Sequence, residues 1–325
     1  MHPAFSIIFL TTLIGAGQGL FLALYSGQLY SVFGLLPTQN PLQFYALGSL
    51  LVLILLVAGL FSSFFHLGRP ERAWRSAARW RTSWMSREVI VLPAFIGIVV
   101  VWGLIHYLGW NPVLFTFRDT FAVDLSLVVG AVATLLCFAL FLCTGMIYAC
   151  IKMLQEWATP LTVINYTLFG GASGFLLATV FAAWQSSEQT GFFAGWAFIL
   201  TILVLITRVA SLFRNARIKP KSSMESAIGI RHGQIVQKAQ GAMGGSFNTR
   251  EYFHDASKRK YRNVKWMFLV LVFPVPLLLL SVGLATDALG LLLAAFLVQY
   301  IGLLMERWFF FAQANHPQNL YYQTV

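Results

Sequence analysis

Residues 44–66 read FYALGSLLVLILLVAGLFSSFFH, and this stretch decides the kind of fold that the chain adopts. It contains no Asp, Glu, Lys or Arg. A helix rises about 1.5 Å per residue, so a stretch of this length can cross the hydrocarbon core of a bilayer. We therefore interpret it as a transmembrane helix that ends at His66.

The whole chain has the composition of a membrane protein. Of its 325 residues, 58% are hydrophobic and only 10% are charged, and the mean hydropathy is +0.73. A soluble domain has roughly 25% charged residues. The composition therefore excludes most soluble enzymes. The basic residues that give the net charge of +11 border apolar segments, so we expect no nucleic-acid partner.

Seven further stretches resemble the first one, which predicts an all-α polytopic membrane bundle of eight transmembrane helices and a single membrane domain over 1–325. Strands are excluded because these stretches are long and continuous. The first lies close to Met1 without a cleavage signal and is expected to be retained. Pro274 and Pro276 predict a kink in the seventh. The eight spans are roughly 5–31, 44–66, 88–110, 122–151, 161–184, 192–213, 264–285 and 288–311.

The basic residues predict the orientation of these helices. Six Arg fall in 66–88, thirteen Lys or Arg in 208–265, and Lys152 and Arg307 near two other helix ends. With eight spans all of these lie on one side, and only Arg118 lies on the other. The positive-inside rule places that side in the cytoplasm, with both termini and the loop 214–263. We expect a multi-pass protein of the bacterial inner (cytoplasmic) membrane.

Cysteine and histidine give no indication of a metal or haem site. Cys137, Cys143 and Cys150 lie in the fourth span without a CxxC pair, and we interpret them as small buried residues. His66 ends the second span on the cytoplasmic side, whereas His106 lies about 27 Å by helix rise from the cytoplasmic start of its helix near Glu88, so they cannot flank one haem. We expect neither a bound metal nor haem in this chain.

The segment 66–88 has the densest chemistry. Arg69, Arg72, Arg75 and Arg79 fall on one face of a short predicted helix that begins at Pro70, which is typical of an interfacial segment. These arginines could face lipid headgroups or a partner. His66 could exchange a proton with a quinone at the membrane boundary, or could simply reach the headgroups. The residues alone leave both alternatives open.

Several separate motifs resemble one known family, the DmsC-type membrane anchor subunits of molybdopterin oxidoreductases in the NrfD-like group. Within it the chain most resembles the anchors of quinone-dependent sulfite dehydrogenases. The lack of haem ligands fits the same family. The motifs are HPAFS at 2–6, HLGRP at 66–70, WRTSWMSRE at 80–88, FNTREYFH at 247–254, ERW at 306–308 and NHPQNLYY at 315–322.

The resemblance implies a three-subunit complex. A molybdopterin catalytic subunit performs the substrate chemistry, and a ferredoxin-like iron–sulfur subunit passes on the electrons, so these cofactors belong to the partners. This chain would anchor both on the bilayer and react with ubiquinone or menaquinone, with no catalytic centre of its own. The resemblance and the topology together suggest quinone-binding residues His66, Gly68, Arg69, Arg72, Tyr148, Asn165 and Tyr166. Residues expected to dock the partners are Arg75, Arg79, Arg250, Tyr252, Phe253 and Arg259.

Other polar residues inside the spans have simpler interpretations. Gln18 lies among glycines that favour close helix packing. Tyr148, Asn165 and Tyr166 could equally hydrogen-bond between helices. Glu306 and Arg307 are expected to pair with headgroups or partner residues.

Four functions are compatible with these expectations. The favoured one is a quinone-reactive anchor that passes electrons in sulfite oxidation to sulfate. The alternatives are a quinol-oxidising anchor of a DMSO-type (sulfoxide) reductase and a secondary transporter, for which the Pro274–Pro276 pair is the only sign. A purely structural anchor without a quinone site is also compatible with the sequence.

Overall fold

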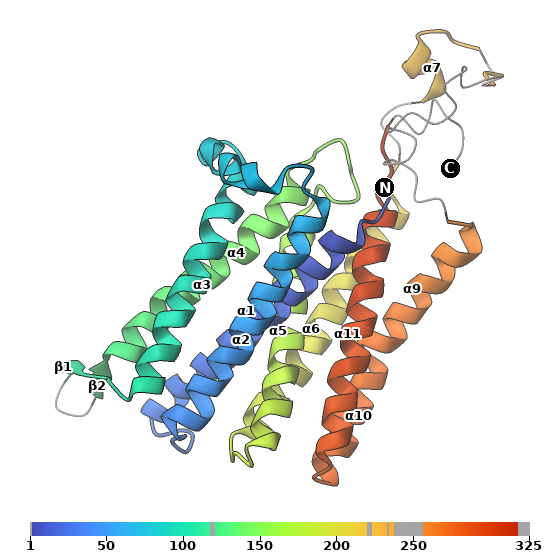
Figure 1. Cartoon of the computed structure of the whole chain (residues 1–325). Coiled ribbons are helices and arrows are strands. Elements are labelled where there is room, and N and C mark those ends of the chain that lie inside the picture. The colour runs from blue at the N-terminus through green and yellow to red at the C-terminus, as the bar shows by residue number, and fades with distance from the viewer. Residues whose placement is uncertain (1, 118–120, 220–222, 233, 237–255, 318–325) are drawn as a thin grey trace.

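The computed structural model describes residues 2–117, 121–219, 223–232, 234–236 and 256–317, and within them the chain is almost entirely helical (Figure 1). Eight helical segments are long and apolar enough to cross a membrane, which confirms the predicted fold class. They are α1 (Phe5–Val32), α2 (Leu47–Ser63) with short turns at Pro41–Ala46 and Phe64–His66, α3 (Trp84–Leu108), α4 (Leu125–Ala149), α5 (Pro160–Trp184), α6 (Thr190–Ala216), α9 (Lys258–Val272) continued by α10 (Pro274–Ala285), and α11 (Leu289–Ala312).

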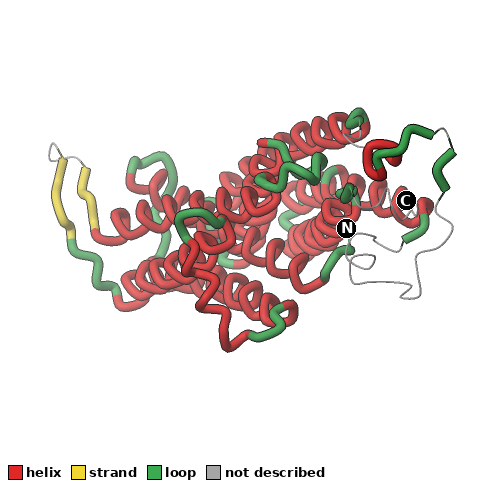
Figure 2. Tube along the Cα trace, turned by 90° about the horizontal axis from the view of Figure 1, so that it is seen from above, coloured by secondary structure: helices red, strands yellow, loops and turns green. Residues whose placement is uncertain are grey.

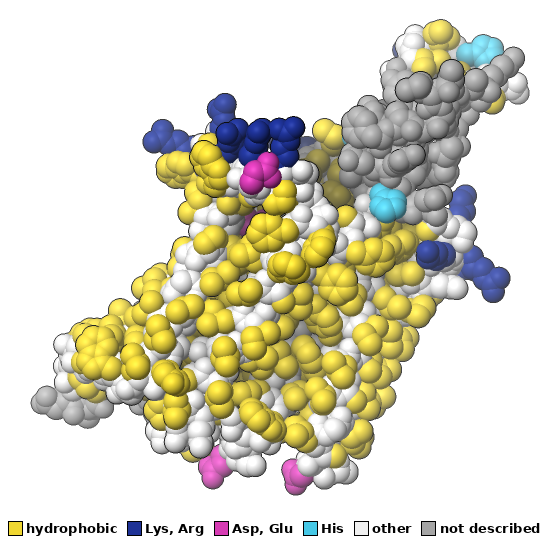
Figure 3. Space-filling view, viewed as in Figure 1, with side chains coloured by type: hydrophobic (Ala, Val, Ile, Leu, Met, Phe, Trp, Pro, Cys, Tyr) yellow, Lys and Arg dark blue, Asp and Glu magenta, His cyan; other side chains and the backbone are white. Residues whose placement is uncertain are grey.

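The helices form a bundle that is elongated in cross-section (Figures 1 and 2). Helices α3 and α4 pack together on one side of the bundle, and α9, α10 and α11 pack together on the other side. Between them α1 packs against α2 and α5, and α5 packs against α6. Most of the outward-facing side chains are apolar (Figure 3), as expected for contact with lipid.

Glycines allow the central helices α1 and α5 to approach closely. A Cβ atom added to Gly19 would overlap with the carbonyl of Gly170, and one added to Gly174 would overlap with the backbone of Gly19. Small residues at such crossings are typical of packed membrane helices. This contact fixes the position of α1 relative to α5.

The kink predicted from Pro274 and Pro276 is present, because the seventh span breaks at Phe273 between α9 and α10. Pro276 has no amide hydrogen to donate to the carbonyl of Val272, four residues earlier. The buried Gln299 of α11 supplies a substitute, with its Nε2 atom 3.4 Å from that carbonyl oxygen. A neighbouring helix therefore satisfies the backbone group that the proline frees.

Some element ends differ from the sequence expectations. Residues 122–124 do not begin the fourth helix but belong to an antiparallel hairpin of β1 (Val113–Phe117) and β2 (Phe121–Asp124). Asp124 then caps α4 by accepting a hydrogen bond from Leu127 N at 2.9 Å. Caps of the same kind start α3 at Trp84 after Ser83 and α9 at Lys258 after Ser257. Apolarity alone did not reveal these polar start signals.

Charge is distributed unevenly between the two ends of the bundle (Figure 3). Every Lys and Arg that the structure describes lies in a connection at one end of the bundle or in the half of a span nearest to it; this end, where α1 begins and α11 ends, is here called the basic end. The described carboxylates Asp124, Glu188 and Asp287 lie at the opposite end. The connection at the basic end after α2 includes a 3₁₀ helix, Pro70–Arg79, and a short helix, α7 (Met224–Ile228), follows α6.

Candidate functional site

Three charged side chains are buried together between α6 and α11. Arg208 Nη2 lies 2.9 Å from Glu306 Oε1, and Arg307 Nε lies 3.2 Å from Glu306 Oε2. All three side chains are at most 4% exposed. The structure thus corrects one expectation, because Glu306 and Arg307 pair inside the bundle and do not face headgroups. This carboxylate provides a partner for two buried guanidinium groups, which would be left unpaired in a dry interior without it.

Arg307 connects this charged cluster to a group of aromatic rings. Its Cζ atom lies 3.8 Å from the centroid of the Tyr166 ring, a cation–π contact. Tyr148 stacks on Tyr166, with ring centroids 5.6 Å apart and planes inclined by 13°. The structure therefore brings together Tyr148 and Tyr166, two of the residues that the sequence suggested for quinone binding.

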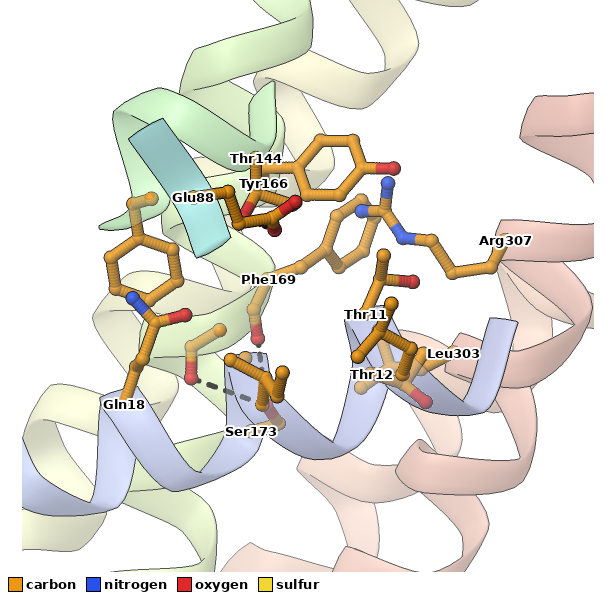
Figure 4. Close-up of a pocket in the computed structure, with 15 residues that line it drawn as sticks. Thr11, Thr12, Gln18, Glu88, Thr144, Tyr166, Phe169, Ser173, Leu303 and Arg307 are labelled. Atoms are coloured by element: carbon orange, nitrogen blue, oxygen red, sulfur yellow. Dashed lines mark hydrogen bonds between the residues drawn. The ribbon is translucent and has the colours of Figure 1, made fainter. Parts of the chain in front are cut away.

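A narrow cavity, here called the central cavity, lies between α1, α3, α4, α5 and α11 (Figure 4). Glu88 and Arg307 reach toward it from different helices, with Tyr166 and Phe169 between them. Glu88 Oε1 accepts a hydrogen bond from Thr144 Oγ1 at 2.5 Å. The residues that line the central cavity are Leu10, Thr11, Thr12, Ile14, Gly15, Gln18, Glu88, Phe141, Thr144, Tyr166, Phe169, Gly170, Ser173, Leu303 and Arg307.

Four polar groups of the central cavity lie at one depth in the bundle. Glu88, Thr144, Tyr166 and Arg307 are each four to six residues from the basic ends of α3, α4, α5 and α11. At the rise of a helix this is about 6–9 Å inside those ends. These four groups are therefore within the membrane-spanning part but near the basic end, and the cavity continues from them toward Gln18 and Ser173 deeper in the bundle.

A second, smaller cavity, here called the loop-side cavity, shares Tyr166 and Arg307 with the first. Asn165 lies in its wall, donates to Ser211 Oγ at 2.9 Å and accepts from Thr207 Oγ1 at 2.7 Å. The predicted residue Asn165 thus joins α5 to α6 beside the cavity. The residues that line the loop-side cavity are Glu156, Thr159, Thr162, Asn165, Tyr166, Arg208, Ser211, Asn215, Glu306, Arg307, Phe310 and Gln313.

The predicted residues His66, Gly68, Arg69 and Arg72 lie on the exposed connection between α2 and α3 and line neither cavity. Gly59 of α2 packs against Ile14 and the backbone of Leu10, and α2 runs antiparallel to α1. His66 is seven residues further along, so it lies nearer to the basic end than the central cavity does. The structure does not bring this group into contact with Tyr148, Asn165 and Tyr166.

The residues expected to dock partners are placed only in part. Arg75 and Arg79 are exposed on the 3₁₀ helix, and Arg259 is exposed in the first turn of α9. Arg250, Tyr252 and Phe253 lie outside the described residues. The connection after the 3₁₀ helix is fixed by Arg87, which donates to the carbonyls of Trp80 at 2.9 Å and Arg81 at 2.8 Å.

Glu88, Thr144 and Arg208 were not predicted from the sequence as residues of a site. A signal existed for Glu88 and Arg208, because ionisable residues within spans mark functional positions more often than surface ones do. Glu88 was assigned to the edge of its span because the start of α3 was placed four residues too late. No signal distinguished Thr144 from other small residues that pack between helices.

The central cavity offers one carboxyl group, one guanidinium group, hydroxyl groups and three aromatic rings. A carboxyl can exchange a proton with a ligand oxygen, and a guanidinium can donate hydrogen bonds to a carbonyl. No group of three or more His, Cys, Asp or Glu side chains that could hold a metal ion occurs in the described parts of the chain. The arrangement suits an uncharged, flat ligand with polar oxygens that gains or loses protons.

Two comparisons with known proteins agree with one another. Residues 1–322 match the family model described as DMSO reductase anchor subunit (DmsC). The chain is also 56% identical over 325 residues to the C subunit of the sulfite dehydrogenase from Allochromatium vinosum, and the match covers 100% of both chains.

Proposed function

Because this chain belongs to the family of DMSO reductase anchor subunits, we propose that it is the quinone-reactive membrane anchor of a three-subunit molybdenum and iron–sulfur oxidoreductase. It passes electrons between an iron–sulfur partner subunit and ubiquinone or menaquinone. The molybdopterin and iron–sulfur cofactors reside in the partners. The chain itself supplies the membrane attachment and the site where quinone is protonated or deprotonated.

The observation that supports a quinone site most directly is the central cavity with Glu88 and Arg307 on its wall. Reduction of a quinone adds two electrons and two protons, so the site needs a proton donor and a group that stabilises negative charge on the ring oxygens. Glu88 supplies the first and Arg307 the second. The cavity is narrow, so a ring enters only as side chains around it move.

The surface residues complete the proposed site. We retain His66, Gly68, Arg69 and Arg72 as its rim, between the central cavity and the basic end. The basic end faces the cytoplasm by the positive-inside rule. Arg75, Arg79 and Arg259 are exposed there and offer a positively charged surface to the iron–sulfur subunit. We retain Arg250, Tyr252 and Phe253, which lie outside the described residues, as further docking residues. In this arrangement electrons enter from the side on which the quinone rim lies.

Sulfite oxidation is the reaction we favour for the complex, because the relative with 56% identity is a subunit of a sulfite dehydrogenase. Electrons would then flow to quinone. The family model is described for DMSO reductase, in which the opposite direction applies. The anchor would then oxidise quinol for a sulfoxide reductase.

Metal content tests the proposal. The tagged chain would be extracted from its host membrane in mild detergent, and molybdenum, non-haem iron and haem would be measured in the purified material. We expect molybdenum with an excess of non-haem iron and no haem. Sulfite-dependent quinone reduction would then be compared with quinol-dependent sulfoxide reduction.

Each outcome has a defined meaning. Sulfite-dependent quinone reduction by the isolated complex supports the favoured direction, and quinol-dependent sulfoxide reduction supports the reverse. A complex with the metals but without any quinone reaction would make the chain a structural anchor only. A metal-free chain that purifies alone would contradict the proposal and favour a transporter, for which the break between α9 and α10 would be the starting point.

A further inference from the structure

The loop-side cavity contains more ionisable groups than packing requires. Two arginines and two glutamates line it, with Asn, Gln and Thr side chains between them. It meets the central cavity at Tyr166 and Arg307, which line both. The two cavities together extend from the proposed quinone site to the connection between α4 and α5, at the basic end.

Glu156 differs from the other charged residues of this cavity. Glu306 is held between Arg208 and Arg307, and both cations would lose their partner if it took up a proton. Glu156 forms no ion pair within the described part of the chain. Its Oε2 atom is buried and accepts no hydrogen bond from any described residue. It is therefore the carboxyl group of this cavity that can bind and release a proton.

The chain fixes the backbone around Glu156. The guanidinium of Arg214 donates two hydrogen bonds of 3.0 Å to the carbonyl of Gln155, and Trp157 Nε1 donates to the carbonyl of Phe310 at 2.9 Å. Asn215 Nδ2 lies 3.4 Å from the carbonyl of Glu156 itself. The half-buried Glu156 is thus held between solvent at the basic end and the interior of the cavity.

Other polar atoms in the same cavity also need partners. Gln313 Nε2 and Arg208 Nε are buried and form no hydrogen bond with the residues that the structure describes. Buried polar groups are normally satisfied by protein or by ordered water, and water enters cavities that are polar. Water in the loop-side cavity would satisfy these atoms and link Glu156 to Arg307 and Tyr166.

We propose that the loop-side cavity is a proton route from the cytoplasmic water to the quinone site, with Glu156 as its entrance. This inference rests on the proposed quinone reaction. Each turnover transfers two electrons from the iron–sulfur subunit to the quinone, and two protons form the two new O–H bonds of the quinol. Glu156 releases each proton inward to the cavity water and is reprotonated from the solvent side.

The variant Glu156→Gln tests this route in the intact, detergent-extracted complex. The amide keeps the shape of the side chain but cannot carry a proton. We expect quinone reduction to slow by roughly ten- to a hundredfold, because one positioned proton donor contributes about a hundredfold or more to a rate. Electron transfer from substrate to a soluble one-electron acceptor that takes up no protons should be unchanged. The exposed Glu225 of α7, at the same end but outside both cavities, provides the control Glu225→Gln.

Two further readouts separate proton transfer from a merely structural effect. The solvent deuterium isotope effect on quinone turnover should increase in Glu156→Gln, and small weak acids such as formic acid should restore part of the rate. Gln313→Leu, which makes the same cavity apolar without removing an acid, should slow turnover and not respond to weak acids.

The outcomes distinguish this route from the function on which it rests. If the unaltered complex reduces quinone but Glu156→Gln and Gln313→Leu both retain its rate and isotope effect, the proton route is wrong and the quinone site stands. If the unaltered complex does not react with quinone at all, the proposed function itself fails, and the route fails with it.

Discussion

At the scale of single residues, the interior of this bundle is organised by a few buried charges. An isolated charge costs several kcal/mol in a low-dielectric interior. Glu306 avoids this cost for two cations at once, since it contacts Arg208 and Arg307 on different sides. Arg307 gains a second partner in the face of Tyr166. Loss of Glu306 would therefore leave two cations without an ionic partner, whereas loss of either arginine would leave one ion pair intact.

This dependence predicts an order of stability losses. Glu306→Leu leaves two buried cations unpaired and should reduce the free energy of unfolding by about 3–5 kcal/mol. Arg208→Met leaves Glu306 paired with Arg307 and should cost less. The exposed pair Glu71–Arg72 provides the control Glu71→Gln, with an effect within about 1 kcal/mol. Thermal unfolding in detergent measures all three, and a larger loss in Arg208→Met than in Glu306→Leu would contradict the argument.

The proposed quinone site makes a second prediction at this scale. Glu88→Gln removes the carboxyl proton but keeps a hydrogen-bond partner for Thr144, and it should lower quinone turnover by up to about a hundredfold. His66→Ala should also lower turnover, because it removes a group from the proposed rim. Assembly with the partner subunits, measured by co-purification, should be unchanged in both variants. Unchanged turnover in either variant removes that residue from the site.

At the scale of elements, the contact between α1 and α5 sets the geometry of the central cavity. Helix α1 supplies Thr11, Thr12 and Gln18, and α5 supplies Tyr166 and Ser173. The glycines at the crossing leave no space for a methyl group. The two walls of the cavity are thus held at a distance that the backbone itself defines.

Gly19→Ala tests this contact. Its new methyl group would overlap with the carbonyl of Gly170 and force α1 and α5 apart. We expect a loss of about 1–3 kcal/mol in stability, as for other overpacked interiors, together with altered quinone turnover. Gly97→Ala in α3 is the matched control, because a Cβ atom there meets nothing within 4 Å. Equal thermal stability of the two variants would show that the crossing tolerates more separation than the structure indicates.

At the scale of the whole molecule, the distribution of charge predicts how the bundle is oriented. The described Lys and Arg side chains gather at one end, and Glu188 and Asp287 lie in connections at the other (Figure 3). If the positive-inside rule holds here, the basic end meets the cytoplasm. The proposed docking surface and both cavities are then nearest to the cytoplasmic partners.

Cysteine labelling checks this orientation. In a Cys150→Ser background, which removes the exposed native cysteine, Asp287→Cys should react with a membrane-impermeant maleimide in intact spheroplasts. Glu225→Cys should react only after the membrane is permeabilised. The reverse pattern would place the basic end outside and would separate both cavities from cytoplasmic partners.

The sequence by itself determined the class of fold, because long uncharged stretches have only one stable form in a bilayer. The same property made the eight helices and the Pro274–Pro276 break readable without a structure. The motifs near His66 and at the chain ends also identified the family, since local sequence is enough to recognise a relative. Helix starts were less predictable, because they depend on single capping residues such as Ser83 and Asp124.

Only the tertiary structure decided which polar residues meet. Glu88, Tyr166 and Arg307 come from three different helices and are more than 70 residues apart in sequence from one to the next. Helix periodicity shows which residues share a face of one helix, but not the helix that this face contacts or the depth at which it does so. Arg208 lies inside a predicted span in the sequence, but only the packing of α6 against its neighbours shows that it pairs with Glu306. The membrane fixes the form of each helix, but close packing between helices fixes the site.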